Sequence, residues 1–174
     1  MSVLLTAVLS FAAVVPLWPL DLPAWPGEEE LVINTAEQEL GVIVEEQLED
    51  VYPVASGTPQ TPTPPGVYQV IVKAEKPYYR AENIEGGDPD NPLGSHWIGL
   101  DVPGSDGRTY GIHGTNEPEK IGEAVSNGCV RMYNEDVTDL YEQIDYGTRV
   151  TVVHEPGQSM EHLAYEALTN AGLH

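Results

Sequence analysis

The sequence is poor in cysteine and in positive charge. It contains one cysteine, Cys129, so no disulfide can form within the chain. Only seven Lys and Arg stand against 28 Asp and Glu, and the resulting formal net charge of −21 repels polyanions and argues against a nucleic acid partner. The acidic runs lack the register of oxygen ligands that a metal loop requires, so we expect a solvated acidic surface and neither a metal nor an organic cofactor.

The sequence also lacks an apolar run long enough for a full membrane span. The run from Val3 to Val15 has 13 positions, the length of a secretory hydrophobic region. We therefore interpret residues 1–27 as a signal or anchor segment with a proline-rich linker, and expect an extracytoplasmic location in the cell wall or periplasm. No Lys or Arg precedes the run, and cleaved and membrane-anchored forms both stay open. The alternative, a buried first element of the domain, is disfavoured by the prolines at 16, 19, 23 and 26.

Short apolar and β-branched clusters dominate the chain after residue 30. They predict strands at residues 31–33, 41–44, 51–55, 67–72, 97–102, 110–112 and 149–153. This spacing favours a mainly β fold, a barrel or sandwich with a few short helices. Four prolines between Thr58 and Gly66 predict a rigid surface connection, and the irregular stretch from Lys76 to Ser95 is typical of a lid or a binding wall.

Two helices are predicted near the C-terminus. The first helix is expected to begin at the cap residue Asn134 and to end before Gly147. The second is expected to begin at the cap residue Ser159 and to reach Gly172. The apolar stripe of the second helix predicts that it packs on the domain. A third, short helix is predicted from Pro118 to Val125. Residues 28–153 would form one domain and residues 154–174 a helical tail.

The segment from Tyr110 to Arg131 carries the residues suited to chemistry. His113 precedes Cys129 by 16 positions. A thiol is only a few per cent ionised at neutral pH, so a nucleophilic cysteine needs a neighbour such as an imidazole to take its proton, and we expect a lowered thiol pKa. Gly128 would let the backbone turn its N–H groups toward a developing oxyanion. Each residue alone is more often structural, and their joint appearance favours thiol catalysis.

The pattern around this segment resembles the signature of the L,D-transpeptidase catalytic domain, the YkuD family. The resemblance extends roughly from Leu31 to Val153. It rests on Tyr110-Gly-Ile-His113-Gly-Thr-Asn116, Ile121-Gly122, Ser126-Asn-Gly-Cys129-Val-Arg131-Met132, Tyr52-Pro-Val54, the proline segment from Thr61 to Gly66, Asn91-Pro-Leu-Gly94, Trp97, Asn134-x-Asp136-Val137 and Gly147-Thr-x-Val150. One position departs from the family pattern, because many members have histidine where this chain has Asn127.

The resemblance implies a barrel-like β-sandwich and a reaction on peptidoglycan stem tetrapeptides. Cys129 would be the nucleophile, His113 the proton donor and acceptor, and the backbone carbonyl of Gly114 the group that orients His113. The resulting thioester would pass to an amine of a second stem and form a 3→3 cross-link with release of D-Ala. Five residues would bind substrate or form the oxyanion site, with the N–H groups of Gly128 and Cys129 as donors: Tyr110, Ser126, Asn127, Gly128 and Arg131.

Several alternatives stay open at this point. Water as acceptor would make the protein an L,D-carboxypeptidase, and a free D-amino acid would give exchange. Arg131 could instead form a structural ion pair, and His96 is interpreted as structural. A sortase is disfavoured by the spacing of 16 between His113 and Cys129, and a non-catalytic wall or spore-coat module would be expected to have lost the thiol or the imidazole. We expect a monomer.

Overall fold

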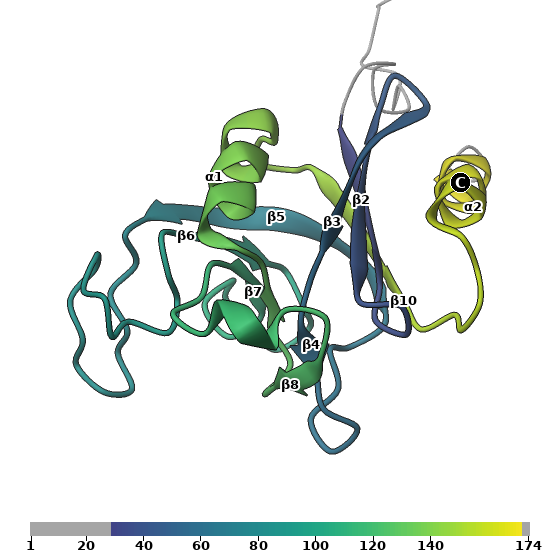
Figure 1. Cartoon of the computed structure of the whole chain (residues 1–174). Helices are drawn as coiled ribbons and strands as arrows, with labels where there is room; N and C mark the ends of the chain where they lie inside the picture. Colours follow the sequence, from purple (N-terminus) through teal and green to yellow (C-terminus); the bar gives the residue numbers. More distant parts are fainter. Residues whose placement is uncertain (1–28, 172–174) are drawn as a thin grey trace, which may run out of the picture.

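The computed structural model describes residues 29–171 (Figure 1). The apolar run from Val3 to Val15, and with it the predicted signal or anchor segment, lies outside the described residues. Within residues 29–171, no helix is both long enough and apolar enough to cross a membrane.

The fold is mainly β, as predicted. Eight strands form one curled sheet, resembling half a barrel, in the order β3-β2-β1-β10-β5-β6-β7-β9, and two short strands form a second sheet (Figure 1). The large sheet contains β1 (Glu30–Asn34), β2 (Glu39–Val44), β3 (Gln47–Pro53), β5 (Gly66–Glu75), β6 (His96–Leu100), β7 (Gly111–His113), β9 (Val130–Arg131) and β10 (Arg149–Val153). The small sheet pairs β4 (Ser56–Gly57) with β8 (Ala124–Ser126) in parallel.

The predicted strand clusters are all found, but the shortest strands were not predicted. β4, β8 and β9 have two or three residues each, too few for a periodic pattern. The predicted helix from Pro118 to Val125 is wrong, because only a 3-10 turn, η1 (Pro118–Lys120), forms there and residues 124–126 join β8. Gly122 has a φ of 94°, which an α-helix does not allow.

The main core lies inside the curl of the sheet. Leu31 and Ile33 of β1 face it, together with Val150 and Val152 of β10. Val32, between Leu31 and Ile33, faces the opposite side and packs under the C-terminal helix. The continuous apolar run of β1 therefore reflects a strand covered on both faces, since successive side chains point to opposite sides.

Helix α1 (Asn134–Gln143) closes one side of the main core (Figure 1). Val137 and Leu140 are buried in that core. The Lys73 ammonium from β5 donates hydrogen bonds to the carbonyls of Tyr141 and Ile144, at 2.7 and 2.5 Å. A cation therefore stabilises the negative end of the helix dipole, in a last turn without basic residues of its own.

Helix α2 (Met160–Ala171) packs on the outer side of β1 and β2, which confirms the prediction that it docks on the domain. Met160, Leu163, Ala164 and Ala167 form a second apolar cluster with sheet residues that include Val32. The N–H of His162 donates to the Ser159 hydroxyl at 3.3 Å, so Ser159 caps the helix as predicted.

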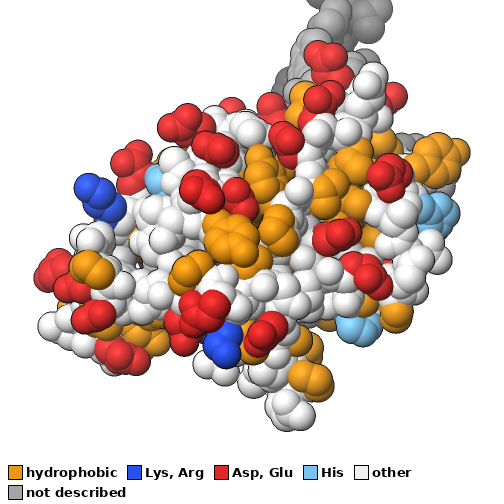
Figure 2. Space-filling model, in the orientation of Figure 1, with side chains coloured by type: hydrophobic (Ala, Val, Ile, Leu, Met, Phe, Trp, Pro, Cys, Tyr) orange, Lys and Arg blue, Asp and Glu red, His pale blue; other side chains and the backbone are white. Residues whose placement is uncertain are grey.

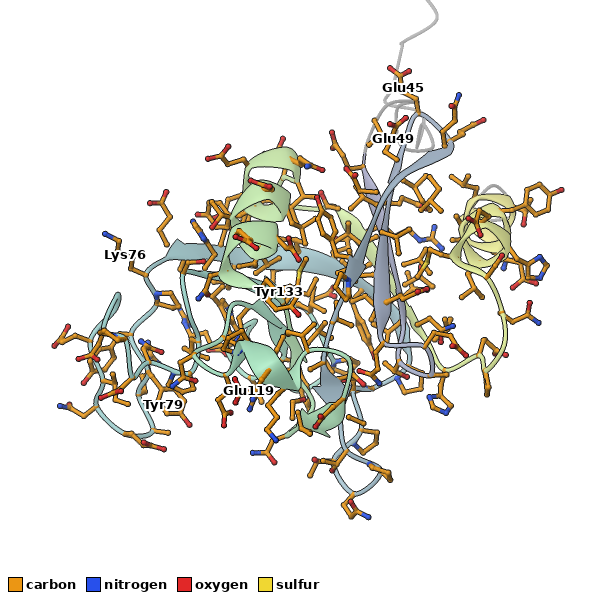
Figure 3. All side chains as sticks on the ribbon, in the orientation of Figure 1. Glu45, Glu49, Lys76, Tyr79, Glu119 and Tyr133 are labelled. Carbon is orange, nitrogen blue, oxygen red and sulfur yellow. The ribbon has the colours of Figure 1, made fainter. Side chains whose placement is uncertain are left out.

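The substitution Lys73→Met should lower the free energy of unfolding by about 1–2 kcal/mol, because the last carbonyls of α1 lose a charged donor. Urea unfolding followed by circular dichroism measures this change. Lys76→Met is the matched control, since Lys76 is exposed and points away from the fold (Figure 3). An equal loss in both variants would contradict a capping role for Lys73.

Candidate active site

Pairing between β7 and β9 places His113 next to the segment that begins at Cys129. The two strands run parallel, with Ile112 opposite Val130 and His113 opposite Arg131. Cys129 immediately precedes β9 and therefore lies beside Gly111. Ile112 and Val130 are both buried in the main core, so the residues on either side of them point to the opposite face of the sheet. His113, Cys129 and Arg131 thus share one face, and Gly111 adds no side chain between the imidazole and the thiol.

The ring of His113 is buried and held from two directions. Its Nδ1 lies 2.6 Å from the carbonyl oxygen of Gly114, and the residue is 4% exposed. A carbonyl can only accept a hydrogen bond, so Nδ1 carries the proton and Nε2 is left as an acceptor. The indole of Trp97 in β6 stacks on the imidazole, with ring centroids 5.5 Å apart and planes at 19°. The Trp97 indole N–H is in turn fixed by the carbonyl of Gly107, at 2.8 Å.

Burial also sets the charge state of His113. Desolvation lowers its pKa from 6.5 to about 4, and the Arg131 guanidinium acts in the same direction, while the carbonyls of Gly114 and Leu93 partly oppose the shift. At neutral pH the imidazole is therefore uncharged and able to accept a proton.

The Cys129 thiol is partly buried and points toward backbone groups. Its Sγ lies 3.4 Å from the carbonyl oxygen of Thr109, to which it donates. Burial raises the pKa of Cys129, and this effect outweighs the opposing influences of the Gly111 backbone and the Arg131 cation. The expected lowered thiol pKa is therefore wrong for the site without substrate, because desolvation disfavours the thiolate. At rest, the pair is a neutral thiol and a neutral imidazole.

A hydroxyl closes the loop before Cys129. Ser126 Oγ donates to the Cys129 carbonyl at 2.5 Å and accepts from the Gly128 N–H at 3.0 Å. Gly128 has a φ of 114°, a conformation that L side chains rarely adopt, and the Tyr110 ring packs against it. Asn127 is exposed at the tip of the loop. The Gly128 N–H, predicted as an oxyanion donor, is engaged with Ser126 in this structure.

Arg131 forms an ion pair beside the loop. Its Nη1 lies 3.0 Å from Oε2 of Glu117, and half of the Glu117 side chain is exposed. The Arg131 backbone exchanges two hydrogen bonds with Ala55, at 2.8 and 2.9 Å, which ties β9 to the segment before β4. Of the two interpretations left open for Arg131, the structure without substrate has the ion pair.

His96 lies outside this constellation. Its Nδ1 is 3.0 Å from the Ser95 hydroxyl and 3.1 Å from the Thr138 hydroxyl, and its ring packs on Tyr141 of α1. This environment agrees with the structural interpretation.

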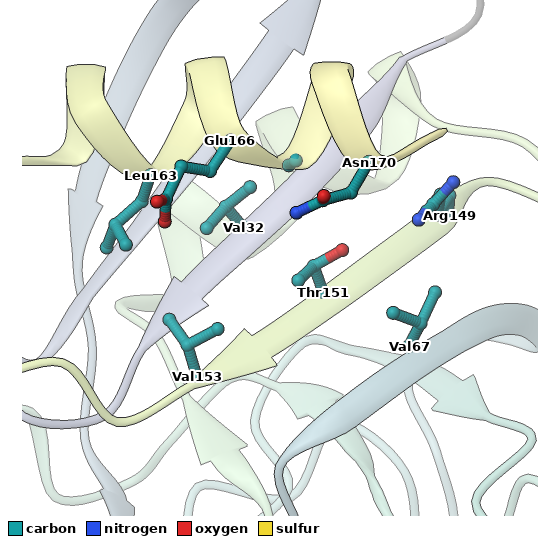
Figure 4. Close-up of a pocket in the computed structure, with 9 residues that line it drawn as sticks. Val32, Val67, Arg149, Thr151, Val153, Leu163, Glu166 and Asn170 are labelled. Carbon is teal, nitrogen blue, oxygen red and sulfur yellow. The ribbon is translucent and has the colours of Figure 1, made fainter. Parts of the chain in front are cut away.

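A groove elsewhere on the molecule has no comparable chemistry. It has a volume of about 110 Å³ and lies between α2 and the outer face of the sheet (Figure 4). Valines and α2 side chains line it, with Arg149, Glu166 and Asn170 at its polar side.

The outer surface is strongly acidic, with Asp and Glu side chains scattered over the face in Figure 2 and few cations. Among residues 29–171, no cluster of His, Cys, Asp and Glu is arranged to hold a metal.

Comparison with known sequences decides the family. The sequence model of the L,D-transpeptidase catalytic domain, YkuD, matches residues 28–152. The chain belongs to the L,D-transpeptidase family. The family acts on peptidoglycan peptides, and membership makes the protein an enzyme of the acyltransferase class.

Two relatives from Bacillus subtilis also carry the L,D-transpeptidase name. The chain is 49% identical over 156 residues to the putative L,D-transpeptidase YqjB, covering 90% of this chain and 88% of the relative. It is 35% identical over 122 residues to the putative L,D-transpeptidase YkuD, covering 70% of this chain and 64% of that relative.

Solved L,D-transpeptidase structures share the fold. A crystal structure from Mycobacterium tuberculosis superposes with a TM-score of 0.61 at 21% identity, covering 74% of this chain and 58% of that one. A second, from Stackebrandtia nassauensis, has a TM-score of 0.59 at 21% identity and covers 79% of this chain and 60% of the other. At this identity the likeness concerns the fold alone, and it agrees with the predicted barrel-like β fold of the L,D-transpeptidase type.

Sequence reasoning missed the residues that support the L,D-transpeptidase site from neighbouring strands and loops. Trp97 was noted only as part of the family pattern, and Glu117 carried no signal that set it apart from the other acidic residues. Asn134 was interpreted as a helix cap, although its side chain binds the loop that follows His113. The position of Trp97 opposite His113 could have been inferred only from the pairing of β6 with β7.

Alkylation of Cys129 should report the neutral resting pair. Iodoacetamide reacts with thiolates, so its rate with the folded protein should be low at pH 7 and rise with a midpoint above that of the unfolded chain, because burial raises the thiol pKa. The same chain in urea is the matched control, since it contains no other cysteine. A rate plateau extending below pH 7 would indicate a preformed ion pair instead.

Acid should destabilise the fold partly through His113. The unfolded chain binds the His113 proton near pH 6.5 and the folded chain only near pH 4, so stability is retained above pH 6.5 and falls as the pH drops toward 4. The full contribution is about 3 kcal/mol. Urea unfolding of wild type and His113→Gln between pH 7 and pH 4 isolates it as the difference between the two curves. Parallel curves would contradict the lowered pKa.

Proposed function

We propose that this family member is a cysteine-dependent L,D-transpeptidase that forms 3→3 cross-links between peptidoglycan stem peptides. The observation that carries the proposal is the buried His113. Its Nδ1 is occupied by the Gly114 carbonyl, which leaves Nε2 as the acceptor, and His113 lies on the same face of the sheet as Cys129. A general base for a thiol nucleophile needs an uncharged imidazole with one nitrogen free to accept a proton, and His113 meets this requirement.

The first half of the reaction acylates the thiol. Cys129 Sγ attacks the carbonyl carbon of the third stem residue while its proton moves to His113 Nε2. The tetrahedral intermediate then collapses, the bond to the terminal D-Ala breaks, and the His113 proton leaves on the D-Ala amine. A thioester remains on Cys129. Because thiol and imidazole are both neutral at rest, proton transfer accompanies the attack and no thiolate needs to persist in the empty site.

The oxyanion of the intermediate needs backbone donors. The Cys129 N–H is the first candidate, since it belongs to the residue that forms the bond. The Gly128 N–H could join it by exchanging its hydrogen bond to Ser126 Oγ for one to the oxyanion. Ser126 would then act through the shape of the loop, with Tyr110 packed against Gly128 to support it.

The second half transfers the acyl group to an amine. A side-chain amine of a second stem attacks the thioester and gives its proton to His113, and the sulfur leaves and recovers that proton. The new amide is the 3→3 cross-link. Water in place of the amine would give a tripeptide.

Arg131 is suited to bind a carboxylate of the stem. Its present partner, Glu117, is half exposed and lies on the loop that follows β7. A substrate carboxylate would replace Glu117 in the same charge-assisted geometry. The negative surface of the protein repels a carboxylate elsewhere, so the carboxylate of a stem would bind preferentially at this cation.

We also propose that the protein acts outside the cytoplasmic membrane, in the cell wall or periplasm, as a monomer. Peptidoglycan is the substrate of the family, and the apolar run from Val3 to Val15 has the length of a secretory hydrophobic region. The same segment would account for any contact with the membrane.

The test is incubation of the purified protein with a disaccharide-tetrapeptide, followed by mass spectrometry of the products and of the intact protein. Wild type should release D-Ala, carry an acyl group on Cys129 and form a cross-linked dimer. Cys129→Ala should form neither adduct nor dimer, and His113→Gln should acylate about a hundredfold to ten-thousandfold more slowly.

His154→Gln is the matched control, since His154 is exposed at the end of β10, and it should keep wild-type activity. Tripeptide without dimer would replace transpeptidation with carboxypeptidase activity. An intact tetrapeptide and an unmodified Cys129 would refute the proposal.

A further inference from the structure

Asn134 binds the backbone on both sides of the site's orienting carbonyl. Its Oδ1 accepts hydrogen bonds from the N–H groups of Ser95, at 3.0 Å, and Thr115, at 3.2 Å. Its Nδ2 donates to the carbonyl of Thr115 at 2.8 Å. All hydrogen bonds of this side chain therefore go to the two loops that flank His113, and none caps its own helix, whose N-cap is Tyr133.

One of these bonds fixes the direction of the Gly114 carbonyl. The Gly114 carbonyl and the Thr115 N–H belong to the same planar peptide unit and point in opposite directions. Asn134 Oδ1 holds the N–H end, and His113 Nδ1 meets the carbonyl end at 2.6 Å. The position of the Asn134 amide therefore sets the orientation of this peptide unit, and the peptide unit sets the orientation of the imidazole. Each hydrogen bond in this chain also polarises the next.

The two loops approach this side chain closely because both carry glycine at the point of contact. A Cβ at either Gly94 or Gly114 would have Asn134 Oδ1 as its nearest neighbour and would clash with it. The Gly114 N–H is also held, by the carbonyl of His96 at 3.2 Å. The helix start, the end of β7 and the segment before β6 are thus joined at one amide group.

We propose that Asn134 is a positioning residue for His113: it fixes the Gly114–Thr115 peptide unit so that the Gly114 carbonyl keeps the imidazole proton on Nδ1. The proposal rests on the proposed function, in which Nε2 must be free to take the Cys129 proton. Asn134 touches neither the thiol nor the imidazole and acts only through the backbone.

Asn134 should affect the orientation of the Gly114–Thr115 peptide unit more than the free energy of unfolding. Asn134 is itself exposed, so water can replace its hydrogen bonds when it is removed. Water does not fix the plane of the Gly114–Thr115 peptide unit, whereas Thr115 is 2% exposed and has few other ways to be held. Loss of Asn134 should therefore disturb the tautomer and orientation of His113 more than it disturbs folding.

The first measurement is the tautomer of His113 at pH 7, from nitrogen-15 NMR of the ring nitrogens, assigned with His113→Gln. Wild type should hold the proton on Nδ1. Asn134→Ala should show a share of the Nε2–H tautomer. This readout needs no substrate, so it decides the proposal even if the protein proves to have a different reaction.

The second measurement is the rate at which a carbapenem acylates Cys129, followed by mass spectrometry. Asn134→Ala should react about tenfold to a hundredfold more slowly, because small errors in catalytic geometry cost rates of this size. Asn134→Asp keeps the acceptor oxygen for Ser95 and Thr115 but loses the donor to the Thr115 carbonyl, so it should recover only part of the rate. If Asn134→Ala does not fold, Asn134→Ser replaces it, since serine also suits a helix start.

Asn34→Ala is the matched control. Asn34 is 1% exposed and also makes three hydrogen bonds, one to Ala36 and two to Glu155, at the far end of β1. This variant should lose more stability than Asn134→Ala and yet keep the wild-type tautomer and rate. An unchanged His113 tautomer in Asn134→Ala would overturn the proposal, whatever the rate, and so would equal rate losses in the two alanine variants.

Discussion

The parallel pairing of β7 with β9 is the constraint on which the site depends. Two register pairs set Ile112 against Val130 and His113 against Arg131. The apolar pair anchors both strands in the core, and the alternation of side chains then sends the imidazole and the thiol to the same outer face. The rest of the fold keeps this short ladder in place, through the backbone bonds of Ala55 to Arg131 on one side and the pairing with β6 on the other.

Around this ladder, uncharged groups do most of the orienting. A carbonyl holds the imidazole, a hydroxyl closes the cysteine loop, and an amide joins the loops behind them. Carboxylates are abundant in the chain, yet the Glu117 carboxylate near the site pairs with Arg131. A neutral framework suits a buried imidazole, since a nearby carboxylate would raise its pKa and favour the charged form before substrate binds.

The sequence was sufficient for the parts of the structure that have local signatures. β1 and β5 have apolar patterns of their own, and Cys129 with His113 lies in a rare and closely spaced motif. β4, β8 and β9 are too short to have a pattern, because their partners elsewhere in the chain define them. Asn134 is a residue type that commonly caps helices, but its side chain hydrogen-bonds the backbone of Ser95 and Thr115 instead. The thiol pKa depends on burial, which no single residue encodes.

The stacking of Trp97 on His113 has a consequence for the order of events. Trp97 holds the plane of the ring and the Gly114 carbonyl engages Nδ1, which leaves Nε2 as the ring atom that can exchange protons. In the proposed reaction that atom must deliver its proton to departing D-Ala before it can receive another from the incoming amine. The leaving D-Ala amine and the incoming amine would therefore use Nε2 one after the other. The enzyme would then follow ping-pong kinetics, in which D-Ala leaves before the second stem reacts.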